Sequence, residues 1–406
     1  MAAVLTLEDA RKRVLDGVAP LQPIDLPLAE AYGCVAAADM STDYDIPPFS
    51  SAQIDGFAAR SADVAAASAD APIRLRVAGW ALVGRPPEAT VGWGEAVRVA
   101  AGAPVPAGAD SIVPTGSFEV DGEHVRVLQP VPAGYAIRPA GEDVAAGTVL
   151  VPAGRRLSAA ELAALATAGY GSAMAYPKVR VGVISVGELV EPGREAGFGE
   201  VRDAGSFLVL GALRDVGASP SRVGIVRDVE KELRDSLSSN SLRADGFVVT
   251  GAPLGGPEAV ANALAGFGEV RSYTAALHPG GSVAAGTVEG KPFFFLPAGA
   301  TAAFVAFEVF VRPAVLRMMG RRDVQRPELS AVLDEPISGP AGMALFVPVR
   351  LSHHDGTWHA TPTGPAAPDR VGAIVHANGL AVIPPGDTAV PAGERARVQV
   401  FRPLDR

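Results

Sequence analysis

The sequence predicts a multidomain protein that combines α/β and β architecture. The chain has 406 residues, which is more than one ordinary hydrophobic core accommodates. Its 46 Gly and 35 Pro divide an apolar content of 48% into short runs, as is typical of short strands and compact helices. From about residue 177, apolar runs alternate with amphipathic helical segments, which indicates parallel βαβ units.

Composition excludes several classes of protein. Lys plus Arg total 35 against 44 Asp plus Glu, and the net charge of -9 argues against nucleic-acid binding or attraction to anionic membranes. Cys34 is the only cysteine, so an intrachain disulfide framework and a cysteine-based zinc or iron–sulfur site are excluded. The sequence has neither a signal-peptide pattern nor a run of roughly 18 apolar residues, and a cytoplasmic location is expected.

The N-terminal elements should be helical. Thr6 is a capping residue with acids in the following turn, and the helix should run to about Leu15. A second short helix is expected around residues 28–32. The clearest helix follows Ser158, with Glu161 at its third position, and we expect it to pack on the N-terminal helix.

Four domains follow from the change of pattern along the chain. Residues 44–141 show brief alternating runs between Pro and Gly, which indicates an inserted β domain. The flanking pieces, 1–43 and 142–176, should form one discontinuous helical domain. Residues 177–326 read as the α/β domain. Beyond a charged linker, residues 327–406 return to short strands and predict a small C-terminal β domain.

Polar groups gather in three segments of the first half. The first, DYDIPPFSSAQIDGFAAR at residues 43–60, carries Ser50, Ser51 and an Asp55–Gly56 turn. The second, at residues 99–114, is a loop whose backbone amides could meet an anion. The third places Glu142 and Asp143 in a Gly-bounded turn, where paired acids either hold a hard cation such as Mg²⁺ or, more commonly, are simply solvated.

In a parallel α/β sheet, ligands bind beyond the carboxyl ends of the strands. Here this rule points to the segments that follow Val186, Val226 and Thr250. We therefore expect the binding site of the α/β domain in those loops.

Five separated motifs make the resemblance to a known family specific. IPPFSSAQIDGFAAR, AAGAPVPAGADSIVP, IRPAGEDVAAGTVLVPAGRRLSAAELAALATAGY, KVRVGVISVGELVEPG and GIVRDVEKEL occur in order. Together they resemble the MoeA family, the bacterial molybdopterin molybdenumtransferases, and are similar also to the E domain of gephyrin. The resemblance extends from about residue 5 to residue 403.

The resemblance implies both architecture and activity. It implies an elongated four-domain protomer with a MogA-like α/β domain, whose sheet is parallel or mixed, and a homodimer in which two subunits share each active cleft. It also implies that molybdate is inserted into adenylylated molybdopterin and AMP is released in the presence of Mg²⁺.

The resemblance also assigns roles to individual residues. The catalytic acids it implies are Asp55, Asp143, Glu188 and Asp228, with Asp228 and Glu188 as metal ligands. The substrate-binding residues it implies are Ser50, Ser51, Gly251, His278, Pro279 and Pro297. Glu188 lies in SVGELV, which is one residue shorter than the family's motif.

Several ligand loops depart from the family pattern. The loops read GAPLGGPEAV at 251–260, TAALHPGGS at 274–282 and LPAGATA at 296–302, and the stretch before HANGL lacks the serines that would contact phosphate. Thr274, His278 and Gly281 stand where lysines are expected. Loss of three charged hydrogen bonds, each about 1.5–3 kcal/mol, would weaken the binding of a dianion by orders of magnitude.

Three hypotheses therefore remain open. The first is a molybdenum cofactor enzyme that uses other cations, such as Arg202 or Arg271. The second is a catalytically impaired relative that serves as a dimeric scaffold for a protein partner. The third is a protein that binds pterin or molybdate without turnover.

Overall fold

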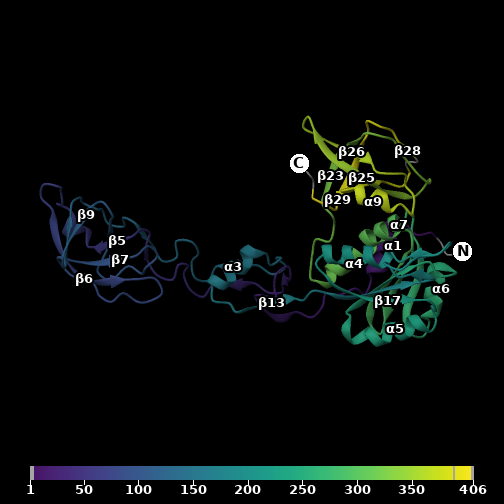
Figure 1. Cartoon of the computed structure of the whole chain (residues 1–406), viewed down its shortest axis with the longest axis horizontal. Coiled ribbons are helices and arrows are strands. Elements are labelled where there is room, and N and C mark those ends of the chain that lie inside the picture. The colour runs from purple at the N-terminus through teal and green to yellow at the C-terminus, as the bar shows by residue number, and fades with distance from the viewer. Residues whose placement is uncertain (1–3, 387–388, 404–406) are drawn as a thin grey trace. The chain divides into compact units, whose positions relative to one another are not determined.

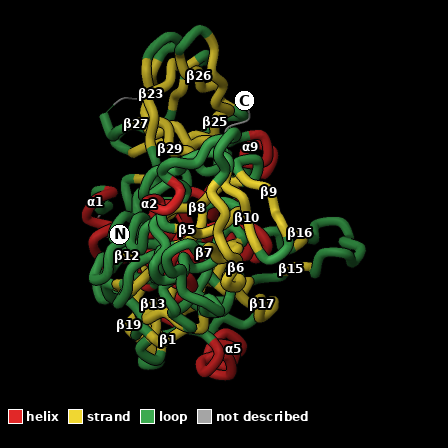
Figure 2. The backbone as a smooth tube through the Cα atoms, turned by 90° about the vertical axis from the view of Figure 1, so that its left-hand side faces the viewer, coloured by secondary structure: helices red, strands yellow, loops and turns green. Residues whose placement is uncertain are grey.

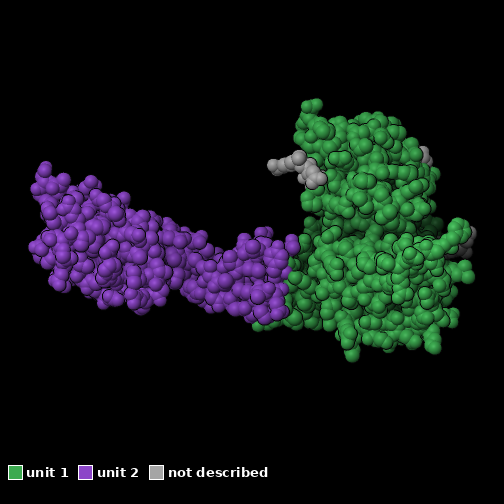
Figure 3. Space-filling view, viewed as in Figure 1, with its two compact units in different colours: residues 1–26, 33–37, 174–406 green, residues 27–32, 38–173 purple. Residues whose placement is uncertain are grey.

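The computed structural model describes residues 4–386 and 389–403. The chain forms two compact units, coloured separately in Figure 3. The larger unit comprises residues 1–26, 33–37 and 174–406, and the smaller unit comprises residues 27–32 and 38–173. The smaller unit is thus an insertion within the sequence of the larger one.

The smaller unit is built mainly of short strands and contains residues 44–141, the segment predicted as a β domain. Its main sheet has the order β8-β5-β7-β6-β10-β9. In chain order these strands are β5 (Gly56–Ala59), β6 (Ile73–Ala81), β7 (Glu95–Val99), β8 (Ser111–Pro114), β9 (Phe118–Asp121) and β10 (His124–Val127). Phe57 and Ala59 enter one core cluster and Ala58 enters another, so apolar side chains cover both faces of the sheet.

Shorter elements complete this part of the chain. They are β1 (Ile24–Pro27), β2 (Val35–Ala36), β3 (Met40–Ser41), β4 (Ser51–Ala52), α2 (Ser61–Val64), β11 (Ile137–Arg138), β12 (Val149–Val151), α3 (Ala159–Thr167) and β13 (Ser172–Tyr176). β4 pairs with β11, and β3 pairs with β12. The helix predicted over residues 28–32 is wrong. The segment forms only hydrogen-bonded turns, because so short a stretch does not offset the cost of helix nucleation.

The capped helix after Ser158 is confirmed as α3. Ser158 and Glu161 form a capping box, in which the Glu161 carboxylate accepts a hydrogen bond from the Ser158 amide at 2.9 Å. Gly169, with a φ of 81°, follows its C-terminal end. Within its own unit, α3 packs against β12.

The N-terminal helix α1 (Leu7–Leu15) belongs to the larger unit. It begins as predicted, since Thr6 Oγ1 accepts a hydrogen bond from the Asp9 amide at 3.1 Å. Ala10 and Val14 on its inner face are buried in the core that also holds the helices of the α/β domain. The apolar face of α1 is therefore covered within the α/β domain.

The predicted α/β domain has a mixed sheet with the order β17-β14-β18-β22-β21-β19. Its elements are β14 (Arg180–Val186), β15 (Leu189–Val190), β16 (Val201–Arg202), α4 (Gly205–Asp215), β17 (Ser219–Val226), α5 (Glu232–Asn240), a 3₁₀ turn (Ser241–Arg243), β18 (Gly246–Gly251), α6 (Gly256–Ala263), β19 (Gly268–Thr274), β21 (Ser282–Val288) and β22 (Lys291–Pro297). The strands β17, β14, β18 and β22 are mutually parallel, as predicted, whereas β21 is antiparallel to both of its neighbours, β22 and β19.

Helices cover both faces of this sheet, as Figure 1 shows for α4 and α5. Along β18, Val248 packs with α4 and with the helix over residues 300–318. Phe247 and Val249 pack with α5 and α6 on the other face. The continuous apolar runs of the sequence thus reflect strands buried on both sides.

A long apolar helix follows β22. It runs through α7 (Ala300–Ala306), a π-helical segment (Phe307–Val311) and α8 (Arg312–Met318). Glu308 in the π-helical segment is buried and accepts hydrogen bonds from Arg326 Nη2 at 2.8 Å and Nε at 2.9 Å. Burial and the neighbouring charge of Arg326 lower the pKa of Arg312 to about 10. Helix α8 and the linker after it are thus held together by charged groups inside the unit.

The C-terminal β domain closes into a barrel-like ring. Its elements are β20 (Leu277–His278), β23 (Glu328–Leu333), β24 (Ile337–Ser338), β25 (Ala344–His354), β26 (Thr357–Pro362), α9 (Val371–His376), β27 (Gly379–Ile383), β28 (Ala389–Val390) and β29 (Arg395–Val400). The order is β20-β25-β26-β23-β29-β27, and β27 also pairs with β25. Figure 2 shows these strands gathered together with α9 beside them. Across the described residues, no helix combines the length and apolarity needed for a transmembrane span.

Candidate functional site

The loops predicted to bind ligand lie at one edge of the α/β sheet. Val186 at the end of β14 pairs with Val226 of β17 on one side and with Gly251 of β18 on the other, and Gly251 pairs with Pro297 of β22. Because these strands are parallel, the segments that follow them emerge at the same edge. Glu188, Asp228, Gly251 and Pro297 are therefore brought to this edge.

Glu188 and Asp228 both interact with neighbouring groups. Glu188 Oε2 lies 3.3 Å from Arg227 Nε in an exposed ion pair. Asp228 Oδ1 accepts hydrogen bonds from the amides of Glu230 at 2.8 Å and Lys231 at 3.0 Å, ahead of α5. Those amides hold the pKa of Asp228 below its ordinary value. Asp228 is thus an ionised acid fixed by its own turn.

These two acids do not form a ready-made metal site. The described residues contain no group of three or more His, Cys, Asp or Glu side chains placed to hold a metal ion. Mg²⁺ is often held by one or two carboxylates together with phosphate oxygens of a substrate and water. Glu188 and Asp228 fit a site that the protein shares with substrate and water. They do not fit a site made of protein ligands alone.

Gly251 acts through its backbone. Its φ is 151°, and a Cβ atom at this position would lie 2.0 Å from the carbonyl oxygen of Val186. Glycine is therefore required where β18 passes β14 at the ligand edge.

His278, Pro279 and Pro297 line one pocket of about 320 Å³. Of the described residues that line it, none is a lysine or an arginine. His278 Nε2 lies 2.8 Å from the carbonyl oxygen of Ala366 and is hydrogen-bonded to it. The pocket thus brings together three of the predicted substrate-binding residues in largely apolar surroundings.

Tight backbone packing accounts for one of the missing lysines. At Gly281, a Cβ atom would lie 2.4 Å from the carbonyl oxygen of Ala275 and 2.6 Å from that of Leu277. Any side chain at this position would require the loop to move. A lysine at residue 281 would not fit this loop conformation.

The C-terminal β domain covers the turn after β22. The Ala302 amide donates to the carbonyl oxygen of Pro368 at 3.0 Å, and Thr301 Oγ1 donates to that of Arg370 at 3.0 Å. A Cβ atom at Gly299 would lie 2.4 Å from the Pro368 carbonyl oxygen. Glycine here allows residues 366–370 to close down on the turn, which explains why LPAGATA departs from the pattern of a Pro-bounded turn.

The predicted residues of the first half belong to the smaller unit. Asp55 Oδ1 accepts a hydrogen bond from the Ala101 amide at 2.7 Å, so this amide of the 99–114 loop is engaged by an acid of the chain itself. At the next residue, a Cβ on Gly56 would lie 2.1 Å from the Val113 carbonyl oxygen, which explains the Asp-Gly sequence. Asp55 is exposed and held at the start of β5.

Asp143 and the two serines differ in accessibility. Asp143 is mostly exposed and lies 3.8 Å from Arg138 Nη2, whereas Glu142 binds the same arginine at 2.8 Å. Ser50 is partly exposed, and its Oγ accepts from the Ala140 amide at 3.4 Å. Ser51 is only 8% exposed. Of the pair, Ser50 is the serine that a ligand could reach.

Sequence reasoning missed a buried charged cluster beside β14. Asp203 is 2% exposed and accepts hydrogen bonds from Ser185 Oγ at 2.7 Å, Ser206 Oγ at 2.6 Å and Arg222 Nη2 at 2.7 Å. Arg222 also bonds Glu191 at 2.9 Å. The motif RDAGS, just before a helix, could have predicted part of this cluster, because an Asp in this position commonly accepts a hydrogen bond from a backbone amide of the helix's first turn. Here that amide belongs to Ser206.

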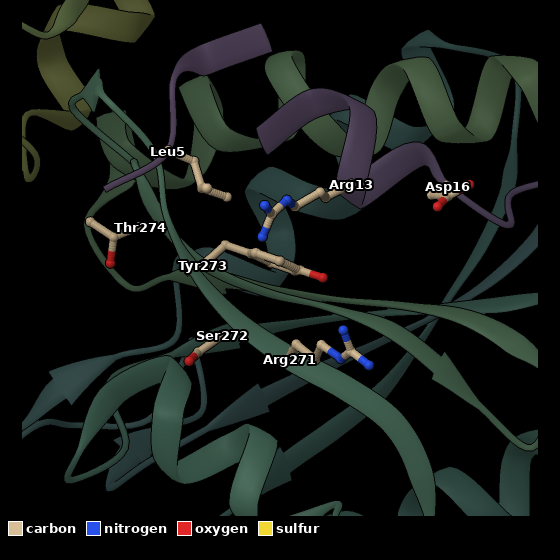
Figure 4. A pocket seen from close by; sticks show the side chains of 7 residues that line it. All are labelled: Leu5, Arg13, Asp16, Arg271, Ser272, Tyr273 and Thr274. Carbon is tan, nitrogen blue, oxygen red and sulfur yellow. The ribbon is translucent and has the colours of Figure 1, made fainter. Parts of the chain in front are cut away.

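The two arginines considered as substitute cations do not line the pocket of His278. Arg202 lies on β16 and donates to the carbonyl oxygen of Arg194. Arg271 lines a different pocket, of about 440 Å³, with Arg13 and Tyr273 (Figure 4). Neither arginine replaces a lysine of the 274–282 loop in this structure.

Family models match the chain in three consecutive parts. The MoeA N-terminal region (domain I and II) matches residues 5–169, the probable molybdopterin binding domain matches 182–317, and the MoeA C-terminal region (domain IV) matches 330–401. The ligand edge that carries Glu188, Asp228, Gly251 and Pro297 lies within the second match.

Individual relatives are similar over nearly the whole chain. Molybdopterin molybdenumtransferase 1 of Mycobacterium tuberculosis is 33% identical, with 96% of this chain and 97% of the relative covered. Molybdopterin molybdenumtransferase 2 of the same organism is 32% identical, with 97% and 98% covered. A crystal structure of a molybdopterin biosynthesis MoeA protein from Pyrococcus horikosii superimposes with a TM-score of 0.83 at 28% identity, covering 99% of this chain and all of the other. The chain therefore belongs to the MoeA family.

Proposed function

We propose that this protein acts in molybdenum cofactor biosynthesis by inserting molybdate into adenylylated molybdopterin with release of AMP. The observation that carries the proposal is similarity over the full length: relatives named molybdopterin molybdenumtransferase align with 96% and 97% of the chain at 33% and 32% identity. The similarity includes the ligand edge of the α/β sheet as well as the scaffold around it.

The pterin substrate is proposed to bind at the strand-end loops of the α/β domain. The pocket of His278, Pro279 and Pro297 offers about 320 Å³ of mainly apolar space. Apolar walls with a few fixed polar groups suit a flat heteroaromatic ring. Residues 366–370 would exclude water from one side of this pocket.

Magnesium is proposed to be shared between protein and substrate. Asp228 and Glu188 would contribute carboxylate oxygens, and the phosphate of the adenylate would contribute others. When bound, the cation would neutralise phosphate charge, which matters in a pocket lacking lysine and arginine among its described lining residues. Asp228 is preorganised for this role because backbone amides keep it ionised.

The remaining acids are proposed to come from a second subunit. Asp55 and Asp143 belong to the smaller unit, and the family resemblance implies a homodimer with shared clefts. Asp55 is exposed, and among the described residues its Oδ1 accepts a hydrogen bond from the Ala101 amide. Asp55 Oδ2 would then be available to orient a displaced oxygen or water at the molybdenum centre, with Ser50 beside the substrate.

Rescue of a bacterial strain that lacks its own MoeA protein tests this function, with nitrate reductase activity as the readout. The unaltered chain should restore activity, and Asp55→Ala should abolish that rescue while leaving the folded protein and its dimer intact. The matched control is Asp121→Ala, which removes an exposed acid of the same unit paired with Arg74 at 3.6 Å, and it should rescue fully. No rescue by a well-expressed chain would reject molybdenum insertion and leave the scaffold or pterin-binding hypotheses. Full rescue by Asp55→Ala would show that the catalytic acid lies elsewhere.

A further inference from the structure

The largest of the described pockets lies in the C-terminal β domain, away from the loops discussed above. Its volume is about 860 Å³, which is within the range of small-molecule sites. The residues that line it include Arg350, Ser352, His354, His376, Asn378 and Arg402. No carboxylate is among its described lining residues, although the chain as a whole carries a net charge of -9. The pocket is therefore lined by cationic and neutral hydrogen-bond donors, although the net charge of the protein is negative.

Strand register places the donors of the first wall on one face. β25 and β26 are antiparallel, with Arg350 opposite Thr361 and Ser352 opposite His359. Because side chains alternate along a strand, Arg350, Ser352 and His354 point to the same side of the sheet. Val349 and Leu351, on either side of Arg350 in the strand, are buried in the barrel core, which fixes this orientation.

The second wall is formed by the end of α9 and the chain after β29. Arg402 Nη1 donates to the carbonyl oxygens of Val375 at 2.9 Å and of Ile374 and Ala377 at 3.3 Å. These bonds satisfy the free carbonyls at the helix end, whose partial negative charge would otherwise repel an anion. His376 lies in the last turn of the same helix.

Internal hydrogen bonds hold this wall in place. The Asn378 side chain accepts from the Leu351 amide at 2.7 Å and donates to the Leu351 carbonyl oxygen at 3.2 Å. Thr363 Oγ1 donates to the carbonyl oxygen of Ala373 at 2.7 Å. The two walls are thus joined through bonds that do not use the guanidinium of Arg350 or the ring of His376.

Arg350 is the clearest free donor. Within the described residues it has no ion pair or hydrogen bond, and its side chain is exposed to the pocket. An arginine presents a planar fork that matches phosphate oxygens. Asp334 of the same barrel is bonded by His359 and Thr361 on the strand that pairs with β25.

We propose that this cavity is a binding site for a small phosphorylated molecule, with Arg350 as the principal phosphate ligand and Arg402, His354, His376 and Ser352 around it. The proposal goes beyond the proposed function and is independent of it. Nothing in it requires the strand-end loops of the α/β domain to bind a pterin.

Isothermal titration calorimetry with inorganic pyrophosphate tests the proposal on the full-length protein. The unaltered chain should bind in a saturable manner. Arg350→Gln and His376→Gln should each raise the dissociation constant about 10- to 100-fold, as expected for loss of a charged hydrogen bond. The matched control is Arg397→Gln, which changes an exposed arginine of the same domain, 3.6 Å from Glu328, and should alter the constant less than about twofold.

Two outcomes would overturn the proposal. One is no saturable binding at millimolar pyrophosphate, and the other is binding that Arg350→Gln and His376→Gln leave unchanged. Asp55→Ala separates this site from the proposed activity. It should abolish molybdenum insertion and bind pyrophosphate as tightly as the unaltered chain.

Discussion

Replacing Asp203 by Asn should loosen the α/β domain around β14. The substitution keeps the size of the side chain but removes the charge that meets Arg222 Nη2 at 2.7 Å. Breaking a buried ion pair costs about 3–5 kcal/mol. Because Arg222 is 21% exposed and keeps Glu191 at 2.9 Å, we expect a smaller loss of about 2–4 kcal/mol.

The effect should depend on pH with a definite sign. Burial alone would raise the pKa of the Asp203 carboxyl, but hydrogen bonds from Arg222, Ser206 and Ser185 outweigh burial, and the pKa lies below its ordinary value. A carboxyl with a lowered folded-state pKa contributes stability above its unfolded value of about 3.9, and that contribution disappears as the pH falls through the folded pKa. The difference between Asp203→Asn and the unaltered chain should therefore be full at pH 7 and shrink below about pH 4.

Hydrogen-exchange mass spectrometry measures this stability locally. Peptides covering β14 and α4 should exchange about 30- to 700-fold faster in Asp203→Asn at pH 7, which corresponds to the expected 2–4 kcal/mol. Asp245→Asn is the control, because its partner Arg180 at the start of β14 is half exposed and the change should cost less than about 1 kcal/mol. Exchange in Asp203→Asn no faster than in the control would refute the argument.

Other substitutions test separate parts of the structure. Glu308→Ala leaves the buried Arg312 and Arg326 without their acid and should lower the free energy of unfolding by about 3–5 kcal/mol. The loss should be measured as faster hydrogen exchange across residues 300–318. A loss below about 1 kcal/mol would contradict this prediction. Gly281→Ala should lower the free energy of unfolding by about 1–3 kcal/mol, because the added Cβ meets backbone oxygens. Gly211→Ala, where the Cβ faces open space in α4, should raise it by up to about 1 kcal/mol. Equal melting temperatures for the two variants would refute this contrast. Ser158→Ala should destabilise α3 by about 1 kcal/mol. Hydrogen bonds from Ser158 and Arg155 lower the pKa of Glu161 to about 2. The stabilisation that Glu161 provides should therefore be complete above about pH 4.3 and be lost as the pH falls towards 2. If the stability of α3 did not change over this pH range, this prediction would be wrong.

Local chemistry was enough to predict the capped helices and the parallel strands. The Thr6 and Ser158 caps are chemical signals that act over a few residues, and the structure confirms both. The apolar runs that became β14 and β18 needed no knowledge of distant contacts, because strands buried on both sides read as continuous hydrophobic segments. Helix α6 was missed because residues 251–260 were interpreted only as a ligand loop, although Pro257 near its start is a helix signal.

Long-range packing decided what sequence patterns could not. An amphipathic helix does not specify its partner, and the pattern of α1 did not reveal that its inner face is buried in the core of the α/β domain. The pairing of Asp203 with Arg222, nineteen positions along the chain, depends on how β17 lies beside β14. The glycines at 281 and 299 likewise follow from backbone contacts with residues 275–277 and 368, which no local pattern reveals.

The ligand residues divide in the same way. The strand-end rule correctly predicted one edge for Glu188, Asp228 and Gly251, since topology alone determines it. The environment of each acid was not predictable, because the Arg227 partner and the amides of residues 230 and 231 depend on loop conformation.

Release of AMP by the purified protein tests the central claim most directly. Adenylylated molybdopterin, molybdate and Mg²⁺ are incubated with the full-length chain, and AMP and metal-loaded pterin are quantified together. We predict that both products form in equal amounts, that both require molybdate, and that Asp55→Ala forms neither. Bound pterin without AMP release, or no binding at all, would contradict molybdenum insertion by this protein.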